Sequence, residues 1–187
     1  MTTSRAVSTI QYGIRMRALL FSGGIDSTAL AWSLKPEKLL FMDYGQVAAE
    51  GELRAAKSIA KALELDLDVR PIPMGRFGQG LLAGGTTVSE TVPEFWPYRN
   101  QALITFAAMA YADLPLSSII IGTVSGDGCR HADGRVEFIE TMDRLLDVQG
   151  GPRLEAPALR MTSEELVEES NVPMSVLGWT FSCHTGE

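Results

Sequence analysis

Cysteine is scarce in this chain of 187 residues. The two cysteines, Cys129 and Cys183, lie far apart in the sequence. A disulfide framework needs several cysteines at short spacings, and a structural zinc site needs four clustered Cys or His ligands. The sequence encodes neither of these locally. We therefore expect a protein that holds no zinc.

Long hydrophobic runs and basic clusters are also missing. No apolar run approaches the roughly 20 residues of a membrane-spanning helix, and the polar first residues lack the apolar core of a signal peptide. Lys and Arg number 16 against 23 Asp and Glu, which gives a formal net charge of -7. Because nucleic acids are bound through clustered Lys and Arg, we expect no direct binding to nucleic acid. Because the chain has no apolar run of spanning length and no signal-peptide core, we expect a cytoplasmic protein that does not bind a membrane.

The remaining composition is ordinary for a folded enzyme, with 45% hydrophobic and 21% charged residues. The length suits one domain with one core, so residues 1–187 are expected to form a single unit. Within it, residues 1–15 are expected to be a flexible terminus. Residues 123–187 are expected to form a loop followed by a small helical segment.

Short apolar runs alternate with helix-compatible segments along most of the chain. This alternation predicts an α/β fold, a Rossmann-like parallel sheet with helices on both faces. The predicted strands are residues 17–21, 38–43, 66–72 and 118–122, and the predicted helices are 27–34, 48–63, 99–114, 136–147 and 162–170. Residues 74–98 are rich in glycine and contain Pro93 and Pro97, which predicts a long loop or lid without regular structure.

The segment Ser22-Gly23-Gly24-Ile25-Asp26-Ser27 lies between the first predicted strand and the first predicted helix, where α/β folds bind phosphates. The glycines let backbone N–H groups approach phosphate oxygens, and the Ser22, Ser27 and Thr28 hydroxyls can donate hydrogen bonds. Asp26 suits a phosphate site if Mg²⁺ lies between the two. The alternative is a tight Gly-Gly turn in which Asp26 or Ser27 only caps the helix.

This pattern is neither a Walker loop, which requires Gly-Lys-Ser/Thr, nor a dinucleotide fingerprint, which requires a third glycine. It resembles the pyrophosphate loop (PP-loop) of the N-type ATP pyrophosphatases. The resemblance implies an adenine nucleotide alpha hydrolase-like fold, use of ATP with Mg²⁺, and transfer of AMP to a substrate while pyrophosphate leaves. It also implies that Ser22, Asp26 and Ser27 are catalytic.

Further motifs resemble the 7-cyano-7-deazaguanine synthase family of queuosine biosynthesis. They follow one another along the chain as Asp43-Tyr44-Gly45-Gln46, Arg99-Asn100, the segment from Gly122 to Arg135, and Trp179-Thr180-Phe181-Ser182-Cys183. The family resemblance implies that the substrate is 7-carboxy-7-deazaguanine. Its carboxylate would become an adenylate, then an amide with ammonia, and finally a nitrile after a second activation.

The resemblance also assigns residues to the two ligands. The implied ATP site adds Asp43, Tyr44, Arg99 and Asn100 to the loop, and the implied substrate site consists of Gln46, Asp127, Asp133 and Arg135. A carboxylate can accept the adjacent N–H donors of a guanine-like base, and Arg135 would act in catalysis by steering the substrate carboxylate or the α-phosphate.

Each of these residues also has a simpler interpretation. Asp127 and Asp133 can be loop or turn residues, and Arg135 can form a surface ion pair. Tyr44 can belong to the core, and Asn100 can cap the helix that follows it.

Several positions depart from the family pattern. The family carries four zinc-binding cysteines; Cys183 fits the first, and no other cysteine follows up to Glu187. Val47-Ala48 replaces Arg-His, and Ser163 replaces a lysine. These departures leave the amine donor open between ammonia and a protein or peptide amine, as in defence-associated relatives. A nucleotide-binding protein without turnover and a homodimeric assembly are also left open.

Overall fold

The structure, a computed structural model, describes residues 15–85 and 96–182. In these residues five strands form one sheet: β1 (Met16–Leu20), β2 (Lys38–Asp43), β3 (Leu67–Pro71), β4 (Leu116–Ile120) and β5 (Arg153–Glu155). Their order is β3-β2-β1-β4-β5, and every neighbouring pair is parallel. The predicted parallel sheet is confirmed, whereas the expected flexibility of residues 1–15 falls largely outside the described residues.

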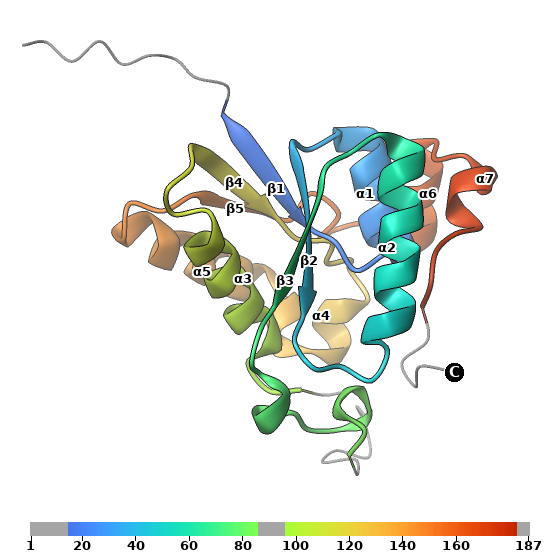
Figure 1. The fold of residues 1–187 in the computed structure, drawn as a ribbon. Helices are drawn as coiled ribbons and strands as arrows, with labels where there is room; N and C mark the ends of the chain where they lie inside the picture. Colours follow the sequence, from blue (N-terminus) through green and yellow to red (C-terminus); the bar gives the residue numbers. More distant parts are fainter. Residues whose placement is uncertain (1–14, 86–95, 183–187) are drawn as a thin grey trace, which may run out of the picture.

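Helices cover both faces of the sheet (Figure 1). One face carries α1 (Ile25–Leu34), α2 (Ala49–Leu63), α6 (Ser163–Ser170) and α7 (Met174–Leu177), and the other carries α3 (Arg99–Ala110) and α5 (Val136–Val148). A short α4 (Asp127–Arg130) and the 3-10 turns η1 (Gly75–Phe77), η2 (Leu81–Ala83) and η3 (Ala132–Gly134) lie in the connections. Both the two-sided arrangement and the C-terminal helical segment were predicted and are confirmed. None of the described helices combines the length and the apolar character of a membrane span.

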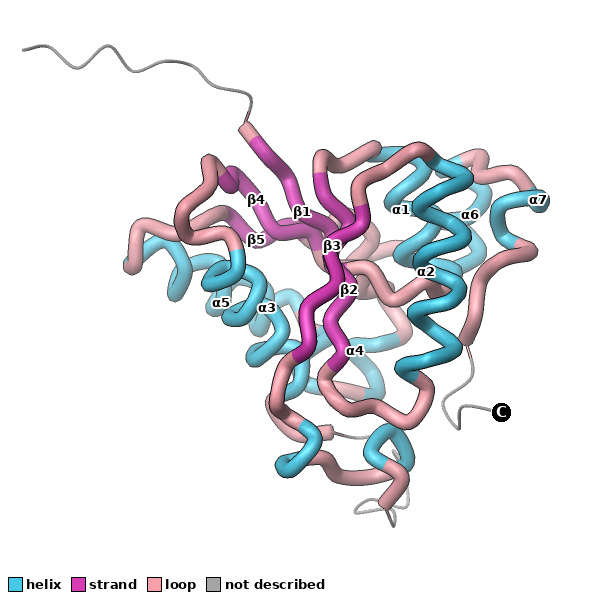
Figure 2. The backbone as a smooth tube through the Cα atoms, in the orientation of Figure 1, coloured by secondary structure: helices cyan, strands magenta, loops and turns pink. Residues whose placement is uncertain are grey.

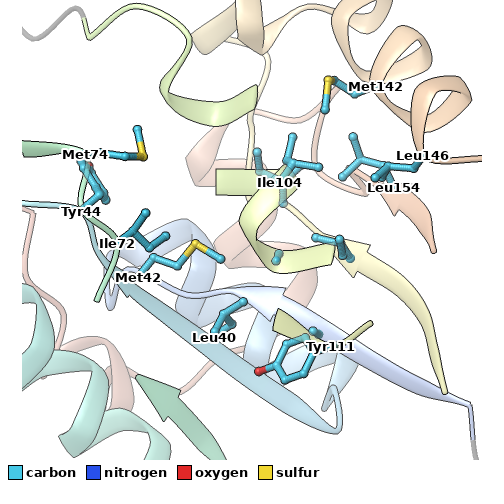
Figure 3. Packing of buried hydrophobic residues seen from close by; sticks show 14 of the residues in the cluster. Leu40, Met42, Tyr44, Ile72, Met74, Ile104, Tyr111, Met142, Leu146 and Leu154 are labelled. Carbon is cyan, nitrogen blue, oxygen red and sulfur yellow. The ribbon is translucent and has the colours of Figure 1, made fainter. Parts of the chain in front are cut away.

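Alternation of side chains along the strands creates the two cores. Leu40 and Met42 of β2 point toward α3 and α5, and Figure 3 shows them on the same side as Ile104. Leu39 and Phe41 of the same strand belong to the opposite core with α1 and α2. Because both faces are buried, the strand has to be apolar throughout, as the sequence Leu-Leu-Phe-Met is.

The first helix illustrates how local sequence sets an element's end. Helix α1 buries Ala29, Leu30 and Ala31 against the sheet. Its last residue is Leu34, and the following cap residue, Lys35, adopts a left-handed conformation with φ 45° immediately before Pro36. A proline cannot continue a helix, because it lacks the N–H group and its ring clashes with the preceding turn.

Several sequence-based boundaries were wrong. The predicted helix 99–114 ends at Ala110, because Tyr111 leaves the helical region with φ -120°. The loop 74–98 was predicted to lack regular structure, but η1 and η2 occur within it, and residues 86–95 lie outside the described ranges. Strand β5 and helices α4 and α7 were missed because elements of three or four residues carry no readable periodicity.

The strand order places a switch point between β1 and β4. The connection that leaves β1 enters α1 on one face, and the connection that leaves β4 leads to α5 on the other face. In Figure 2, α1 and α5 lie on opposite sides of the strands. In open α/β sheets such a divergence leaves a crevice beyond the carboxyl ends of the strands, and ligands bind there.

Candidate active site

A cavity of about 470 Å³ opens at this switch point. Its polar wall combines the loop after β1, the turn after β2, the start of α3, the loop after β4 and two later segments. The polar and glycine residues along it are Ser22, Gly24, Asp26, Ser27, Tyr44, Gln46, Glu52, Arg99, Asn100, Gly122, Thr123, Asp127, Ser163 and Ser182. The volume lies within the range of small-molecule sites.

The loop after β1 presents its polar groups to the cavity. Gly24 is the N-cap of α1, and the first N–H groups of a helix have no partners within the helix. The Ser22 and Ser27 hydroxyl oxygens lie 3.3 Å apart, and the Gly24 N–H donates to Ser22 Oγ at 3.2 Å. Gly23 has φ 77°, and a Cβ there would lie 2.9 Å from the backbone nitrogen of Ala56. This left-handed, closely packed position requires glycine.

Two predicted ATP-site residues do not reach the cavity. The Thr28 side chain is fully buried, and its hydroxyl finds no hydrogen-bond partner in the described part of the chain. The Asp43 carboxylate accepts a hydrogen bond from the Gly45 N–H at 3.1 Å, which holds the turn after β2. Neither residue lines the cavity wall.

Asp26 is the most unusual polar group of the wall. It is partly buried, and its Oδ1 atom has no hydrogen-bond partner among the described residues. Burial is the main cause that raises the pKa of Asp26, and the nearby carboxylates of Asp127 and Glu164 raise it further. A hydrogen bond from Ser163 acts in the opposite direction. The fold therefore holds an incompletely compensated carboxylate beside the phosphate loop.

Replacing Asp26 with asparagine is expected to stabilise the ligand-free protein at neutral pH. A raised pKa means that the folded state binds more protons than the unfolded state, so this group lowers stability as pH rises above the usual aspartate range. We expect a gain of about 1 kcal/mol, or roughly 2–4 °C in Tm, because the asparagine cannot ionise.

Thermal melting of Asp26→Asn and the wild type from pH 4 to pH 8 measures this effect. The difference between the two proteins should shrink toward pH 4, where the wild-type carboxylate becomes protonated. A variant that melts below the wild type at pH 8 would contradict a desolvated carboxylate. Asp113→Asn, an exposed change far from the cavity, is the control.

The turn after β2 is held by Gln46. Its Oε1 accepts from the Tyr44 N–H at 2.9 Å, and its Nε2 donates to Glu52 Oε2 of α2 at 2.8 Å. Gln46 is only 4% exposed, although it lines the cavity. Gln46, which was predicted to bind substrate, thus also stabilises the turn. It holds the side chain of Glu52, which lines the same wall.

Tyr44 and Arg99 meet at the same side of the cavity. The Tyr44 ring is buried and forms an edge-to-face contact with Trp96, with ring centroids 5.2 Å apart. Burial raises the pKa of Tyr44, and a hydrogen bond with Arg99 opposes this. The Arg99 Nε donates to Asn100 Oδ1 at 3.2 Å. Among the described residues of the wall, Arg99 is the one basic side chain.

Of the three substrate residues predicted after β4, one lines the cavity and two do not. Asp127 lines the cavity, and its Oδ2 accepts from the Val124 N–H at 3.1 Å. Arg135 is exposed and donates from Nε to the Gly128 carbonyl at 3.1 Å. Asp133 and Arg135 lie outside the wall, and the hydrogen bond to Gly128 holds Arg135 beside α4, which begins at Asp127.

Sequence reasoning missed other wall residues. Glu52 and Thr123 gave no sequence signal, because a glutamate in a helix and a threonine after a strand are common. Ser163 was noted only as a departure from the family. Phe181 and Ser182 lie in a recognised motif, and their place beside the phosphate loop depends on tertiary structure. Cys183 lies outside the described residues.

A parallel sheet whose first strand leads through Ser-Gly-Gly-x-Asp-Ser into a helix at the switch point defines a protein of the PP-loop ATP pyrophosphatase class. The fold is similar to that of the U34-tRNA thiolase NcsA from Methanococcus maripaludis, solved with its [4Fe-4S] cluster, with a TM-score of 0.56. The similarity covers 92% of this chain and 62% of the thiolase chain at 11% sequence identity, so it concerns the fold alone.

The family model described as queuosine biosynthesis protein QueC matches residues 17–187, and the chain belongs to this family of enzymes. It is 34% identical to 7-cyano-7-deazaguanine synthase 1 of Desulfitobacterium hafniense, over 89% of this chain and 80% of that protein. It is 31% identical to the 7-cyano-7-deazaguanine synthase of Methanothrix thermoacetophila, over 88% of this chain and 83% of the relative. The corresponding synthase of Methanothermobacter thermautotrophicus is 28% identical, with coverage of 92% and 86%.

Proposed function

We propose that this protein uses ATP to adenylate the carboxylate of a 7-deazaguanine-type acid, 7-carboxy-7-deazaguanine, and passes the activated group to ammonia. One observation carries the proposal. The Ser22–Ser27 loop and Asp127, on the segment after β4, line one cavity at the switch point of the sheet. A nucleotide and a second small molecule can therefore meet there.

The proposed first step is attack by a substrate carboxylate oxygen on the α-phosphorus of ATP. A new phosphorus–oxygen bond forms, the bond from the α-phosphorus to the bridging oxygen breaks, and pyrophosphate leaves. The N–H groups at the start of α1 and the Ser22 and Ser27 hydroxyls would hold the departing pyrophosphate. Arg99 would offset charge on the reacting phosphates, since catalysis of this kind rests on positioning and charge stabilisation.

The wall also fits Mg²⁺, which carries ATP in such sites. Asp26 offers a buried carboxylate oxygen that has no hydrogen-bond partner among the described residues, and it lines the wall near Asp127. Carboxylate oxygens are the ligands that Mg²⁺ prefers. Such an ion would supply positive charge that offsets the charge of the phosphates. Asp26 would hold it together with ATP, which leaves Asp127 for the second substrate.

The cavity offers suitable surroundings for a flat heterocycle. Leu40 and Met42 of β2, Leu103 of α3 and Ile121 after β4 form an apolar part of the wall. A carboxylate such as Asp127 can accept the ring N–H and amino donors of a guanine-like edge. Asp133 and Arg135, outside the wall in this structure, remain predictions for substrate binding.

After adenylation, ammonia would attack the acyl carbon and AMP would leave, which gives the amide. In a second round the amide oxygen would attack another ATP at the α-phosphorus, again with departure of pyrophosphate. Loss of AMP and two protons from that intermediate leaves the nitrile, 7-cyano-7-deazaguanine. The amide-to-nitrile stage thus consumes a second ATP.

The test is incubation of the purified protein with ATP, Mg²⁺, the acid and ammonium, followed by pyrophosphate assay and mass spectrometry. We expect pyrophosphate and AMP together with amide or nitrile. A protein whose mass increases by the acyl group would instead indicate conjugation to a protein amine. Absence of AMP and pyrophosphate with this acid, while ATP binds, would contradict the proposal and favour a binding protein without turnover.

A further inference from the structure

The segment that follows α7 returns to the phosphate loop. Figures 1 and 2 show the chain after α7 descending beside α2. There the Phe181 N–H donates a hydrogen bond to the Gly23 carbonyl at 3.1 Å. Phe181 and Ser182 then form part of the cavity wall. A segment more than 150 residues away in sequence thus contacts the first glycine of the loop.

The Phe181 ring sits on a glycine of α2. A Cβ added to Gly51 would lie 2.7 Å from the nearest ring carbon, which is closer than any real contact of that kind. Gly51 is inside a helix, where alanine is the more favourable residue. The ring also packs against the core between α1, α2 and the sheet. The missing side chain at Gly51 therefore provides the space that the ring occupies.

This contact fixes the direction of a peptide group in the loop. The Gly23 carbonyl and the Gly24 N–H belong to one planar trans peptide, so they point in opposite directions. Phe181 binds the carbonyl, which leaves the Gly24 N–H directed toward Ser22 Oγ, and both of these residues line the cavity. On its other side Gly23 packs against α2, where a Cβ would lie 2.9 Å from the Ala56 nitrogen.

We infer that Phe181 is a positioning residue for ATP, which acts by holding the Gly23–Gly24 peptide so that its N–H fixes the Ser22 hydroxyl at the cavity wall. The segment after α7 thereby helps to form the phosphate site. This inference rests on the proposed function, because it assigns the cavity beside Gly24 to the phosphates of ATP. If the segment moves away, the peptide can rotate and present its carbonyl oxygen to an anion.

Gly51→Ala is the sharpest test, because it displaces the ring without weakening α2. We expect calorimetry to show ATP binding about tenfold weaker, the effect of one misdirected hydrogen bond to a charged group. Phe181→Ala should weaken binding similarly. The double variant Gly51→Ala/Phe181→Leu, whose smaller side chain accepts the new methyl group, should recover binding to within about threefold. Lys57→Ala, exposed on the same helix, is the matched control and should bind as the wild type does.

A second readout separates positioning from general destabilisation. Hydrogen exchange of the peptide covering residues 19–30 should accelerate in Gly51→Ala and Phe181→Ala, while the peptide covering β3 stays unchanged. Unchanged ATP affinity and loop exchange in both variants would overturn the inference and leave the proposed function intact. If the wild type itself binds neither ATP nor pyrophosphate, both fail together.

Discussion

A protein with valine in place of Gly24 is expected to keep its fold and to bind ATP at least about 100-fold more weakly. Gly24 has φ -80° and ψ 171°, an extended conformation that valine adopts readily. A Cβ there would lie 3.3 Å from Ser22 Oγ and 3.7 Å from Ser182 Oγ, which the surroundings can accept with small shifts. The branched methyl groups would then occupy the space in front of the α1 N-terminus, where phosphates have to approach.

Calorimetry with ATP and with pyrophosphate, combined with thermal melting, measures the effect of this substitution. Gly75→Ala is a glycine control outside the cavity, since among the described residues a Cβ there meets only Gly45 at 3.8 Å. Gly23→Val is less informative, because its left-handed backbone and its contact with α2 would disturb folding as well. If a folded Gly24→Val protein bound ATP with wild-type affinity, this result would contradict the proposal that the loop binds the phosphates.

Loss of Arg99 is the second large effect that we expect. Arg99→Ala should lower kcat/KM for pyrophosphate release by about 10²–10³-fold, as removal of one charge-stabilising donor does in other enzymes. Arg99 is the one basic side chain in the described part of the wall. The same wall carries the carboxylates of Asp26, Glu52 and Asp127, so Arg99 is the side chain that can offset the charge of the phosphates. Arg99→Lys should recover only part of the activity, because lysine lacks the planar fork of donors.

The effect should appear mainly in kcat if Arg99 acts on charge that develops as pyrophosphate leaves. Arg54→Ala is the control, since Arg54 is an exposed cation of α2 that pairs with Glu50. Thermal melting has to accompany the assay, because Arg99 also contacts Tyr44 and Asn100. If the activity of Arg99→Ala stayed within about threefold of the wild type, another group would have to stabilise the charge of the phosphates.

The sheet and the loop between β1 and α1 could be predicted because their signals are local. Strand β2 is apolar over most of its length, and the apolar residues of α2 recur with helical spacing. Both elements and their order can therefore be predicted from the sequence. Strand β5 could not be predicted, since Leu154 is the one buried residue in its three positions. Its place in the sheet depends on pairing with β4.

The sequence indicates which residue types the candidate site contains, but not how they are arranged in space. The residue types at Ser22 and Asp26 indicated a phosphate site, but sequence alone does not tell which side of α1 faces the cavity. Thr28 was therefore predicted at the wall, whereas its side chain is buried in the fold. Glu52 and Phe181 reach the cavity from α2 and from the C-terminal segment, and only tertiary packing brings them there.

Exchange of labelled pyrophosphate into ATP tests adenylation at this site most directly. With Mg²⁺ and 7-carboxy-7-deazaguanine but without ammonium, we expect label to appear in ATP, because the adenylate forms reversibly while pyrophosphate is present. Exchange should depend on the acid and should be absent in Gly24→Val. No exchange with this acid, or formation of ADP and phosphate in its place, would contradict attack of the carboxylate on the α-phosphorus.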